Sequence, residues 1–289
     1  MNPQHTIGRE VYFQGIGLHT GNLCKTVFQP APAGSGVRLV RSDLPGQPSI
    51  QAHYSNVLSV IRGTTVGNED MRVHTIEHML SAVYALEIDN LVIQLNANEP
   101  PVADGSSQGF FDTLKEAGVV PQDAPRDVLQ PAERLDYRGG DTEITLEPAD
   151  YLELTTVVVY NHPLIQRQEA TLRIDPQTYR QEIAPARTFC FDYEVEALKK
   201  QGLARGGSLD NAVVIGLDRI HNKEKKLRFP NEFARHKALD LLGDLFLLGR
   251  PLTGRITAVR CGHGHNINFV KQIAQRFLER SSVYAADRS

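Results

Sequence analysis

Hydrophobic side chains recur every three or four positions across residues 229–249, a spacing that places them on one face of a single α-helix. A proline near the start and a glycine at the end suit the two ends of such a helix. A polar stripe follows the same helix, because His236, Asp240 and Asp244 succeed one another at intervals of four residues. Each interval rotates the side chain by only about 40°. An imidazole and a carboxylate one turn apart can both reach a divalent ion, although an exposed helix edge with ordinary charges shows the same pattern.

A shorter apolar pattern predicts a second helix over residues 72–86, with Glu77 and His78 side by side in an otherwise apolar turn. Burying a carboxylate and an imidazole is costly without partners, so we expect either a structural ion pair or a metal site here. The His-Glu-x-x-His zinc motif is absent, because no second histidine stands in the required slot. Any further metal ligands must therefore come from a distant helix.

The remaining β-rich and apolar stretches occur in a similar order in the two halves of the chain. In the first half we expect strands at 10–15, 24–29, 37–41 and 89–97 and a helix at 104–117. In the second half we expect strands at 142–148, 151–160, 211–216 and 255–260 and helices at 192–200, 229–249 and 267–279. This order predicts an α+β fold of two similar units that face each other.

The predicted domain limits follow from one proline-rich stretch without periodicity. We expect a first α+β domain at 1–119, a linker at 120–131, a second α+β domain at 132–280 and a flexible polar tail at 281–289.

Composition excludes several classes of protein. The 289 residues carry a net charge of -3, which offers no general basic field for nucleic acid. We expect a cytoplasmic protein without stable membrane insertion, because the chain shows neither a signal pattern nor the roughly 18 apolar residues that a spanning helix needs. The 3 cysteines are widely spaced and without Cys-x-x-Cys, so we expect reduced thiols and a metal site, if any, made of histidine and carboxylate.

Two glycine-rich stretches carry further histidines. His19 lies in the turn at 15–21, which lacks the Gly-Lys-Ser/Thr of a phosphate loop. His263 and His265 lie between the last predicted strand and the last predicted helix. Because glycines flank these two histidines, we expect the histidines to be exposed and mobile enough to act on a ligand. A loop without a chemical role fits the pattern equally well.

Together these stretches resemble the UDP-3-O-acyl-N-acetylglucosamine deacetylases of lipid A biosynthesis. The matching stretches run in family order over nearly the whole chain: 15–21, 75–78, 104–106, 186–189, 206–208, 233–244 and 262–263 with Asn266. The resemblance implies a β-α-α-β sandwich in which the helices of both domains pack between two sheets. It also implies zinc, bound by His78, His236 and Asp240, and Fe(II) could replace zinc at such a site.

The resemblance further implies a catalytic role for each of five residues. Glu77 would be the general base for a zinc-activated water that attacks the acetamide carbonyl of the sugar. Protonated His263 would stabilise the oxyanion and protonate the leaving amine, with Asp244 holding its imidazolium. Thr188 and Lys237 would contact the oxyanion and polar groups of the substrate.

The substrate implied by the resemblance is a small UDP-acyl-amino sugar. The residues implied to contact it are Phe189, Phe191, Leu203, Gly207 and His19. The fatty chain could supply much of the binding energy, at about 0.8 kcal/mol per buried methylene. The structural alternative is that both phenylalanines belong to the core.

The chain departs from the family pattern at two places. His265 stands where the family usually has leucine, which raises the question of which histidine is the acid, and Arg205 stands where the family often has an apolar residue. Two other functions fit the residues: a zinc amidase of the same fold acting on another acylated amino sugar, and a catalytically inactive binding relative. We expect a monomer, and no fused dehydratase domain, because the last predicted helix ends close to Ser289.

Overall fold

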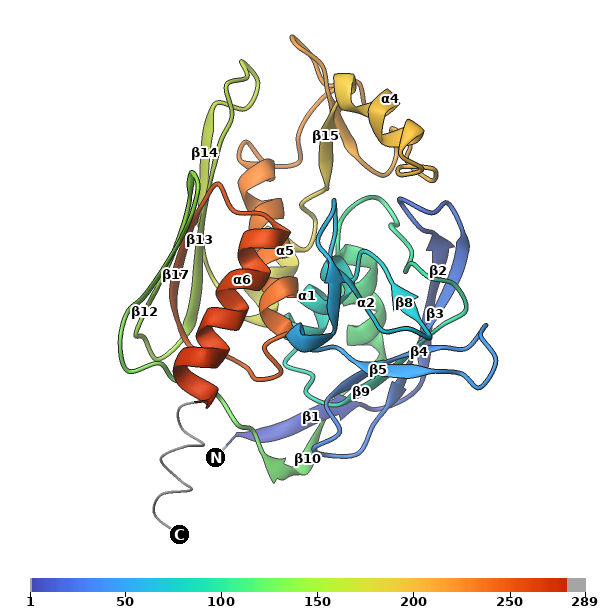
Figure 1. The fold of residues 1–289 in the computed structure, drawn as a ribbon, viewed down its shortest axis with the longest axis vertical. Helices are drawn as coiled ribbons and strands as arrows, with labels where there is room; N and C mark the ends of the chain where they lie inside the picture. Colours follow the sequence, from blue (N-terminus) through green and yellow to red (C-terminus); the bar gives the residue numbers. More distant parts are fainter. Residues whose placement is uncertain (1, 280–289) are drawn as a thin grey trace.

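Two five-stranded sheets enclose a double layer of helices in the computed structural model, which describes residues 2–279 (Figure 1). The first sheet has the order β2 (Val11–Ile16), β3 (Leu23–Pro30), β9 (Leu91–Leu95), β4 (Val37–Arg41) and β5 (Ser49–Gln51). The second has the order β11 (Leu135–Gly139), β12 (Thr142–Glu147), β17 (Gly254–Val259), β13 (Leu152–Val159) and β14 (Arg167–Arg173). The helices between them are α1 (Glu77–Ala85), α2 (Gln108–Ala117), α5 (Glu232–Phe246) and α6 (His263–Ile273). The predicted α+β sandwich is confirmed.

The two sheets share one pairing pattern. In each sheet the only parallel neighbours are the third and fourth strands, β9 with β4 and β17 with β13, and every other pair is antiparallel. Each sheet also receives its central strand after the first helix of its inner layer, α1 before β9 and α5 before β17. The repeated order of elements in the sequence therefore corresponds to a repeated topology.

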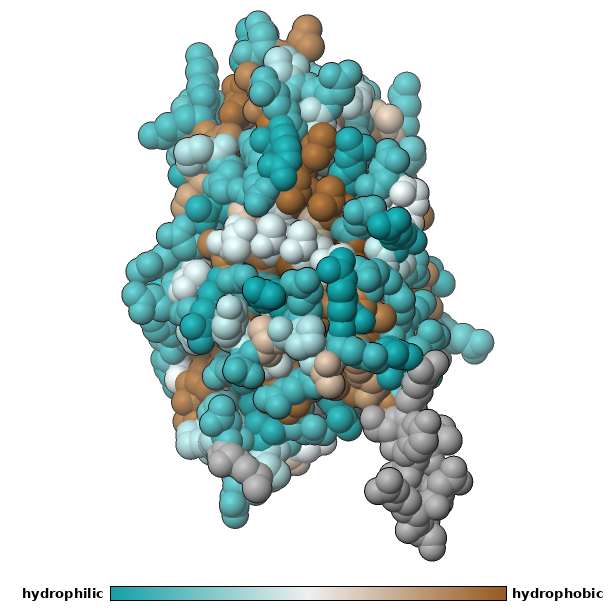
Figure 2. All heavy atoms as spheres, turned by 90° about the vertical axis from the view of Figure 1, so that its left-hand side faces the viewer, coloured by the Kyte–Doolittle hydropathy of each residue, from teal (hydrophilic) through white to brown (hydrophobic). Residues whose placement is uncertain are grey.

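Alternating burial explains why each sheet has a dry face and a wet face. Along β17, residues alternate between buried and solvent-facing positions, as expected for a strand with one side against helices. Figure 2 views the outer side of the second sheet, which is mostly hydrophilic, with hydrophobic residues gathered in its upper part.

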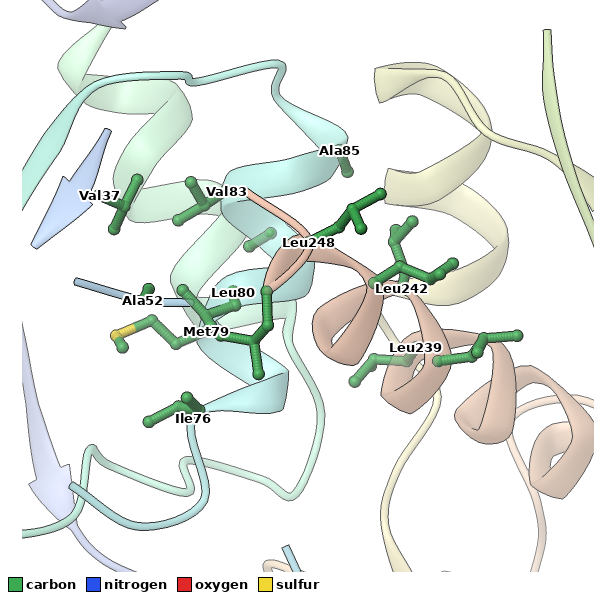
Figure 3. Close-up of a cluster of buried hydrophobic side chains, with 14 of the residues drawn as sticks. Val37, Ala52, Ile76, Met79, Leu80, Val83, Ala85, Leu239, Leu242 and Leu248 are labelled. Atoms are coloured by element: carbon green, nitrogen blue, oxygen red, sulfur yellow. The ribbon is translucent and has the colours of Figure 1, made fainter. Parts of the chain in front are cut away.

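The helices α1 and α5 meet at the centre of the molecule. Figure 3 shows Met79 of α1 pointing toward Ala52, away from α5, and Leu239 and Leu242 on α5, and all four side chains are buried. The backbones approach so closely that a Cβ atom at Gly243 would lie 2.1 Å from the carbonyl oxygen of Glu77. The first turn of α1 is thereby fixed against the middle of α5, and these two places carry the polar residues singled out from the sequence.

The predicted start of the first helix is wrong. It begins at Glu77, not at residue 72, because Thr75 adopts a φ of 53°, which is incompatible with a helix, and Arg72–Val73 form strand β8. The helices α2 and α5 are also shorter than predicted, since residues 104–107 form turns and α5 ends before Gly249 (φ 76°).

The last helix starts earlier than predicted, at His263 in place of Ile267. Gly262 precedes it in extended conformation and accepts a hydrogen bond from the backbone of Asn266. The expectation of an exposed, mobile loop is therefore wrong for His263, which is held in the first helical turn with 12% of its side chain exposed. A π-helical stretch, η3 (Ala274–Glu279), continues α6.

Smaller elements surround the sandwich. β1 (Pro3–Ile7) pairs with β10 (Val119–Pro125), so the first part of the predicted linker is a strand paired within the first half of the chain, and the domain limits stay a prediction. Near the other end of the molecule, β15 (Phe189–Phe191) pairs with β16 (Val213–Ile215) beside α4 (Asp192–Lys200) (Figure 1). The remaining elements are η1 (Tyr54–Asn56), β6 (Val57–Ser59), β7 (Thr65–Gly67), β8 (Arg72–Val73), α3 (Pro176–Thr178) and the π-helical η2 (Tyr179–Ile183).

Two further predictions concern cysteines and termini. Cys24, Cys190 and Cys261 are free thiols, as expected. Within residues 2–279 no helix combines the length and apolar character needed to cross a membrane. The predicted tail at 281–289 lies outside the described residues.

Candidate functional site

The facing parts of α1, α5 and α6 bring together six of the residues predicted from the sequence. Glu77 and His78 open α1, His263 opens α6, and α5 contributes the three polar residues of its stripe, His236, Asp240 and Asp244. All three residues of the stripe are buried, which excludes an exposed helix edge.

The first cluster has Asp240 at its centre. The Nε2 atoms of His78 and His236 lie 3.8 and 3.4 Å from Oδ1 of Asp240. One ligand atom from each of the three residues lies within 4.8 Å of the others, so the set could hold a single metal ion. The two imidazole rings stand almost perpendicular, at 80°, with centroids 5.0 Å apart.

The polar contacts of this cluster fit a cation. Oδ1 of Asp240 is buried and has no hydrogen-bond partner in the described part of the chain, whereas Oδ2 accepts a hydrogen bond of 2.8 Å from Lys237. An unpaired buried carboxylate oxygen is costly, and a cation at this position would satisfy it. Nδ1 of His236 lies 3.1 Å from the carbonyl oxygen of Ala186, so the tautomer that donates there leaves Nε2 free as a ligand.

Protonation states point the same way. Burial lowers the pKa of His78 to about 3 and also lowers the pKa of His236, so both rings are neutral near pH 7. Burial alone would raise the pKa of Asp240, but the imidazole of His236, the ammonium of Lys237 and the imidazole of His263 hold that pKa below its usual range. Neutral imidazoles and an ionised carboxylate are the forms that bind metal ions.

The second cluster has Asp244 at its centre, one turn further along α5. Nδ1 of His263 lies 2.9 Å from Oδ2 of Asp244, and Nε2 of His263 lies 3.7 Å from Oε1 of Glu77. Asn266 donates a further hydrogen bond of 2.9 Å to Oδ2, and the hydroxyl of Thr64 donates to Oδ1. Both oxygens of this carboxylate are thus satisfied by protein.

The same surroundings raise the pKa values of both Glu77, the predicted base, and His263, the predicted acid. Burial raises the pKa of Glu77 to about 7, and the nearby Asp240 and Asp244 carboxylates add to the rise. Burial opposes charge on His263 as well, but the carboxylates of Asp244, Glu77 and Asp240 outweigh it and raise the pKa of His263 to about 10. Glu77 is poised to take a proton near neutral pH, while His263 carries one that it can donate.

An apolar cavity adjoins the first cluster. Its volume is about 290 Å³, and its lining includes four of the predicted residues: His19, Thr188, Phe189 and Gly207. The ring of Phe189 has its centroid 6.2 Å from that of His236, so this residue borders both the cavity and the metal-binding set. Nζ of Lys237 lies 5.6 Å from the centroid of Phe189.

Two other predicted substrate residues are not among those that line this cavity. The ring of Phe191 stacks on Tyr193 at 5.2 Å and packs against Tyr160, inside a small hydrophobic cluster against which Phe189 also packs. Leu203 lies between α4 and Gly207 in the sequence, close to residues that line the cavity, but it does not line the cavity itself.

His19 connects three segments of the chain. Its backbone N–H donates to the buried carboxylate of Glu99 and its Nδ1 accepts from the backbone of Ala204 at 3.3 Å, while Nε2 lies 3.2 Å from the carbonyl oxygen of Arg62. Arg205, the departure from the family pattern, is exposed and donates its backbone N–H to His19.

The two histidines of the last glycine-rich stretch separate clearly. Nδ1 of His265 lies 3.0 Å from the hydroxyl of Tyr137 on β11, on the side of α6 that meets the second sheet. Of His263 and His265, only His263 contacts carboxylates of the site, those of Glu77 and Asp244.

Three polar residues at or near the site were not predicted from the sequence: Thr64, Glu99, and Asn266 in its role as a hydrogen-bond donor to Asp244. The side chains of these three are completely buried, but a single threonine, asparagine or glutamate carries no spacing that would single it out. A larger cavity, of about 510 Å³, lies at the far end of α5 near Phe246 and Arg126 and contains none of the predicted site residues.

Known proteins are similar in sequence to this chain over nearly its full length. Residues 4–275 match the family described as LpxC: UDP-3-O-acyl N-acetylglycosamine deacetylase. Relatives named UDP-3-O-acyl-N-acetylglucosamine deacetylase occur in Bdellovibrio bacteriovorus (42% identical, covering 93% of this chain and 89% of the relative) and in Phenylobacterium zucineum (42% identical, 94% of each). A relative named bifunctional enzyme LpxC/FabZ, from Chlorobaculum tepidum, is 40% identical over 97% of this chain, which spans 66% of that protein. The chain belongs to the LpxC family of UDP-3-O-acyl N-acetylglycosamine deacetylases.

Proposed function

We propose that this chain hydrolyses the N-acetyl group of UDP-3-O-acyl-N-acetylglucosamine, giving UDP-3-O-acyl-glucosamine and acetate, as a zinc-dependent deacetylase of lipid A biosynthesis. Family membership and the names of the relatives support the substrate and the reaction. The observation that carries the mechanism is the position of Glu77, which lies next to His78 in sequence and faces His263 across 3.7 Å.

His78, His236 and Asp240 would hold the metal ion. A histidine and carboxylate set without cysteine favours zinc, and Fe(II) could occupy the same ligands. When bound, a divalent cation supplies Lewis acidity, which makes a water molecule acidic and polarises a carbonyl oxygen.

The residues around this set would move the protons. Glu77 accepts the proton of the attacking water, because its raised pKa of about 7 makes it a stronger base than an ordinary carboxylate and leaves a substantial fraction of it ionised at neutral pH. His263, held as an imidazolium by Asp244, donates a proton to the departing nitrogen. Lys237 and Thr188 would stabilise negative charge on the former carbonyl oxygen, since Lys237 donates to the metal-binding Asp240 and Thr188 lines the adjoining cavity.

The cavity beside Phe189 would take the acyl chain. Apolar residues from α4 and β16, including Val195, Leu198 and Val214, line it together with Phe189. His19 and Gly207, at the same cavity, would contact the sugar end of the substrate, and Leu203 and Phe191 would support the lining from behind.

Family membership also bears on the wider assignment. We propose a cytoplasmic monomer, and the domain limits of 1–119 and 132–280 with a linker between them. The absence of a membrane-crossing helix in residues 2–279 is compatible with that location.

The test is release of free amine from UDP-3-O-acyl-N-acetylglucosamine by the purified protein and by Glu77→Ala, each with one equivalent of zinc. We expect turnover by the wild type and a loss of about 10²-fold or more in the variant, as for removal of a general base. Equal turnover of simpler N-acetylglucosamine derivatives would instead favour a zinc amidase for other amino sugars. Absence of turnover and of zinc binding would favour an inactive binding relative.

A further inference from the structure

We propose that Thr64 is a positioning residue that holds the base and the acid-orienting carboxylate in one arrangement. This inference rests on the proposed function, because it gives Thr64 a role through Glu77 and Asp244. Thr64 lies just before β7, in a connection that belongs to neither α1 nor α5, and its side chain is completely buried.

The backbone of Thr64 fixes Glu77. Its N–H donates a hydrogen bond of 2.9 Å to Oε2 of Glu77, and its carbonyl oxygen accepts a hydrogen bond of 3.2 Å from the N–H of Ile76. Gly63 leaves room for this approach, since a Cβ atom there would lie 3.1 Å from Oε1 of Glu77. Residues 63 and 64 therefore pack against the first turn of α1.

The side chain of Thr64 fixes Asp244. Its hydroxyl donates to Oδ1 of Asp244, while Oδ2 receives the hydrogen bonds of His263 and Asn266. A carboxylate with donors on both oxygens has little freedom to rotate, so the direction of the His263 ring depends on the donor at Oδ1 as well. Removing that donor leaves a buried, charged oxygen unsatisfied.

One residue thus reaches two groups that lie far apart in sequence, Glu77 at a separation of 13 residues and Asp244 at a separation of 180. Because both bonds come from the same residue, the distance between base and acid is set by the geometry of Thr64 and not by the packing of the helices alone. Glu77 takes a proton from water, and His263 gives a proton to the departing nitrogen. The distance between Glu77 and His263 therefore affects kcat and has little effect on substrate affinity.

The experiment compares Thr64→Val, which keeps shape and backbone N–H but lacks the hydroxyl, with Thr64→Ser, which restores the hydroxyl. For the valine variant we expect kcat to fall about 10- to 100-fold, as for loss of one hydrogen bond to a charged group, with KM within about twofold of wild type. Thr64→Ser should recover most of kcat. Thr65→Val is the matched control, because it removes the neighbouring buried hydroxyl, whose contact is His74 and not the site, and it should keep wild-type kcat.

A second measurement does not depend on turnover. The proton between Nδ1 of His263 and Asp244 should give a downfield NMR signal in the wild type, and this signal should shift upfield in Thr64→Val and return in Thr64→Ser. Unchanged kcat and signal in Thr64→Val, or equal losses in the valine and serine variants, would overturn the proposal. If Thr64→Val does not fold, Thr64→Cys replaces it, because its thiol is a weaker donor than a hydroxyl. We expect an intermediate kcat for Thr64→Cys, and a wild-type kcat for this variant would contradict the proposal. Failure of the proposed function is separate, because then the wild type itself does not turn over while the NMR comparison still decides the role of Thr64.

Discussion

Asp240 and Asp244 are two buried aspartates one helical turn apart on α5, yet their surroundings differ in kind. Among residues 2–279, Asp240 has one oxygen bound by Lys237 and one oxygen without a hydrogen-bond partner, next to two histidines whose pKa values are lowered. Asp244 has both oxygens bound, and the pKa of the histidine that it contacts is raised.

The difference shows how one helix can serve two chemical purposes. The Asp240 cluster is electrostatically incomplete without a cation, whereas the Asp244 cluster is complete and instead stabilises a proton on His263. Loss of a ligand from the first cluster should therefore release the metal ion, whereas loss of the acid from the second cluster should leave the metal ion bound. The predictions below test this division, beginning with the largest effect.

Removal of a ligand from the Asp240 cluster should have the largest effect. His236→Ala should lose bound zinc and reduce kcat by about 10³-fold or more, since the Lewis acid contributes several kcal/mol to the transition state. Metal analysis and amine release on the same preparation provide the measurement. A variant that retains one equivalent of zinc would place the metal elsewhere.

Removal of the acid should cost somewhat less and should spare the metal. His263→Ala should lower kcat by about 10²- to 10⁴-fold, the range for general acid–base groups, with zinc content unchanged. His265→Ala is the matched control two residues away, and it should keep wild-type activity because its contact is Tyr137. Comparable losses in both variants would contradict the assignment of the acid.

The pH profile should show both titrations. Activity requires ionised Glu77 and protonated His263, so kcat/KM should fall below about pH 7 and above about pH 10. Turnover requires bound zinc, and a bound cation favours the carboxylate and disfavours the imidazolium, so the measured limbs should lie at lower pH than these two values. The alkaline limb should be absent in His263→Ala, and its persistence there would assign it to another group.

The smallest effects should come from the aromatic residues near the cavity. Phe189→Leu should raise KM for a substrate with a long acyl chain several-fold and leave KM for a short-chain analogue nearly unchanged, because only the long chain fills the cavity. Phe191→Leu should lower thermal stability and leave KM nearly unchanged, since its ring is buried in the hydrophobic cluster against which Phe189 packs and does not line the cavity. Comparison of KM for the two chain lengths decides between lining and core, and equal KM effects for both phenylalanines would refute the distinction.

The sequence predicted the main elements well where their hydrophobic period was long or their β-formers were dense. The pattern over 229–249 located α5, and 37–41 coincides with β4. The start of α1 was missed because Thr75 adopts a backbone conformation that no local pattern announces. The start of α6 was missed because glycines and histidines have weak helical propensity, and tertiary contacts of His263 and Asn266 outweigh it.

The candidate site was predictable in part for a similar reason. His236, Asp240 and Asp244 share a helix edge, so spacing alone brought them together, but only the resemblance to a family joined them to Glu77, His78 and His263. Thr64 and Glu99 each make several hydrogen bonds from short connecting segments, where the position of a residue depends on the whole fold.

The central claim is that Asp240 binds the metal ion and that Asp244 does not. The most direct measurement is the zinc content of Asp240→Asn and Asp244→Asn, purified side by side and dialysed against the same low zinc concentration. We predict that Asp240→Asn retains far less than one equivalent of zinc and that Asp244→Asn retains one equivalent while losing most of its activity. Full zinc content in Asp240→Asn, or its loss in Asp244→Asn, would contradict this division between the two clusters.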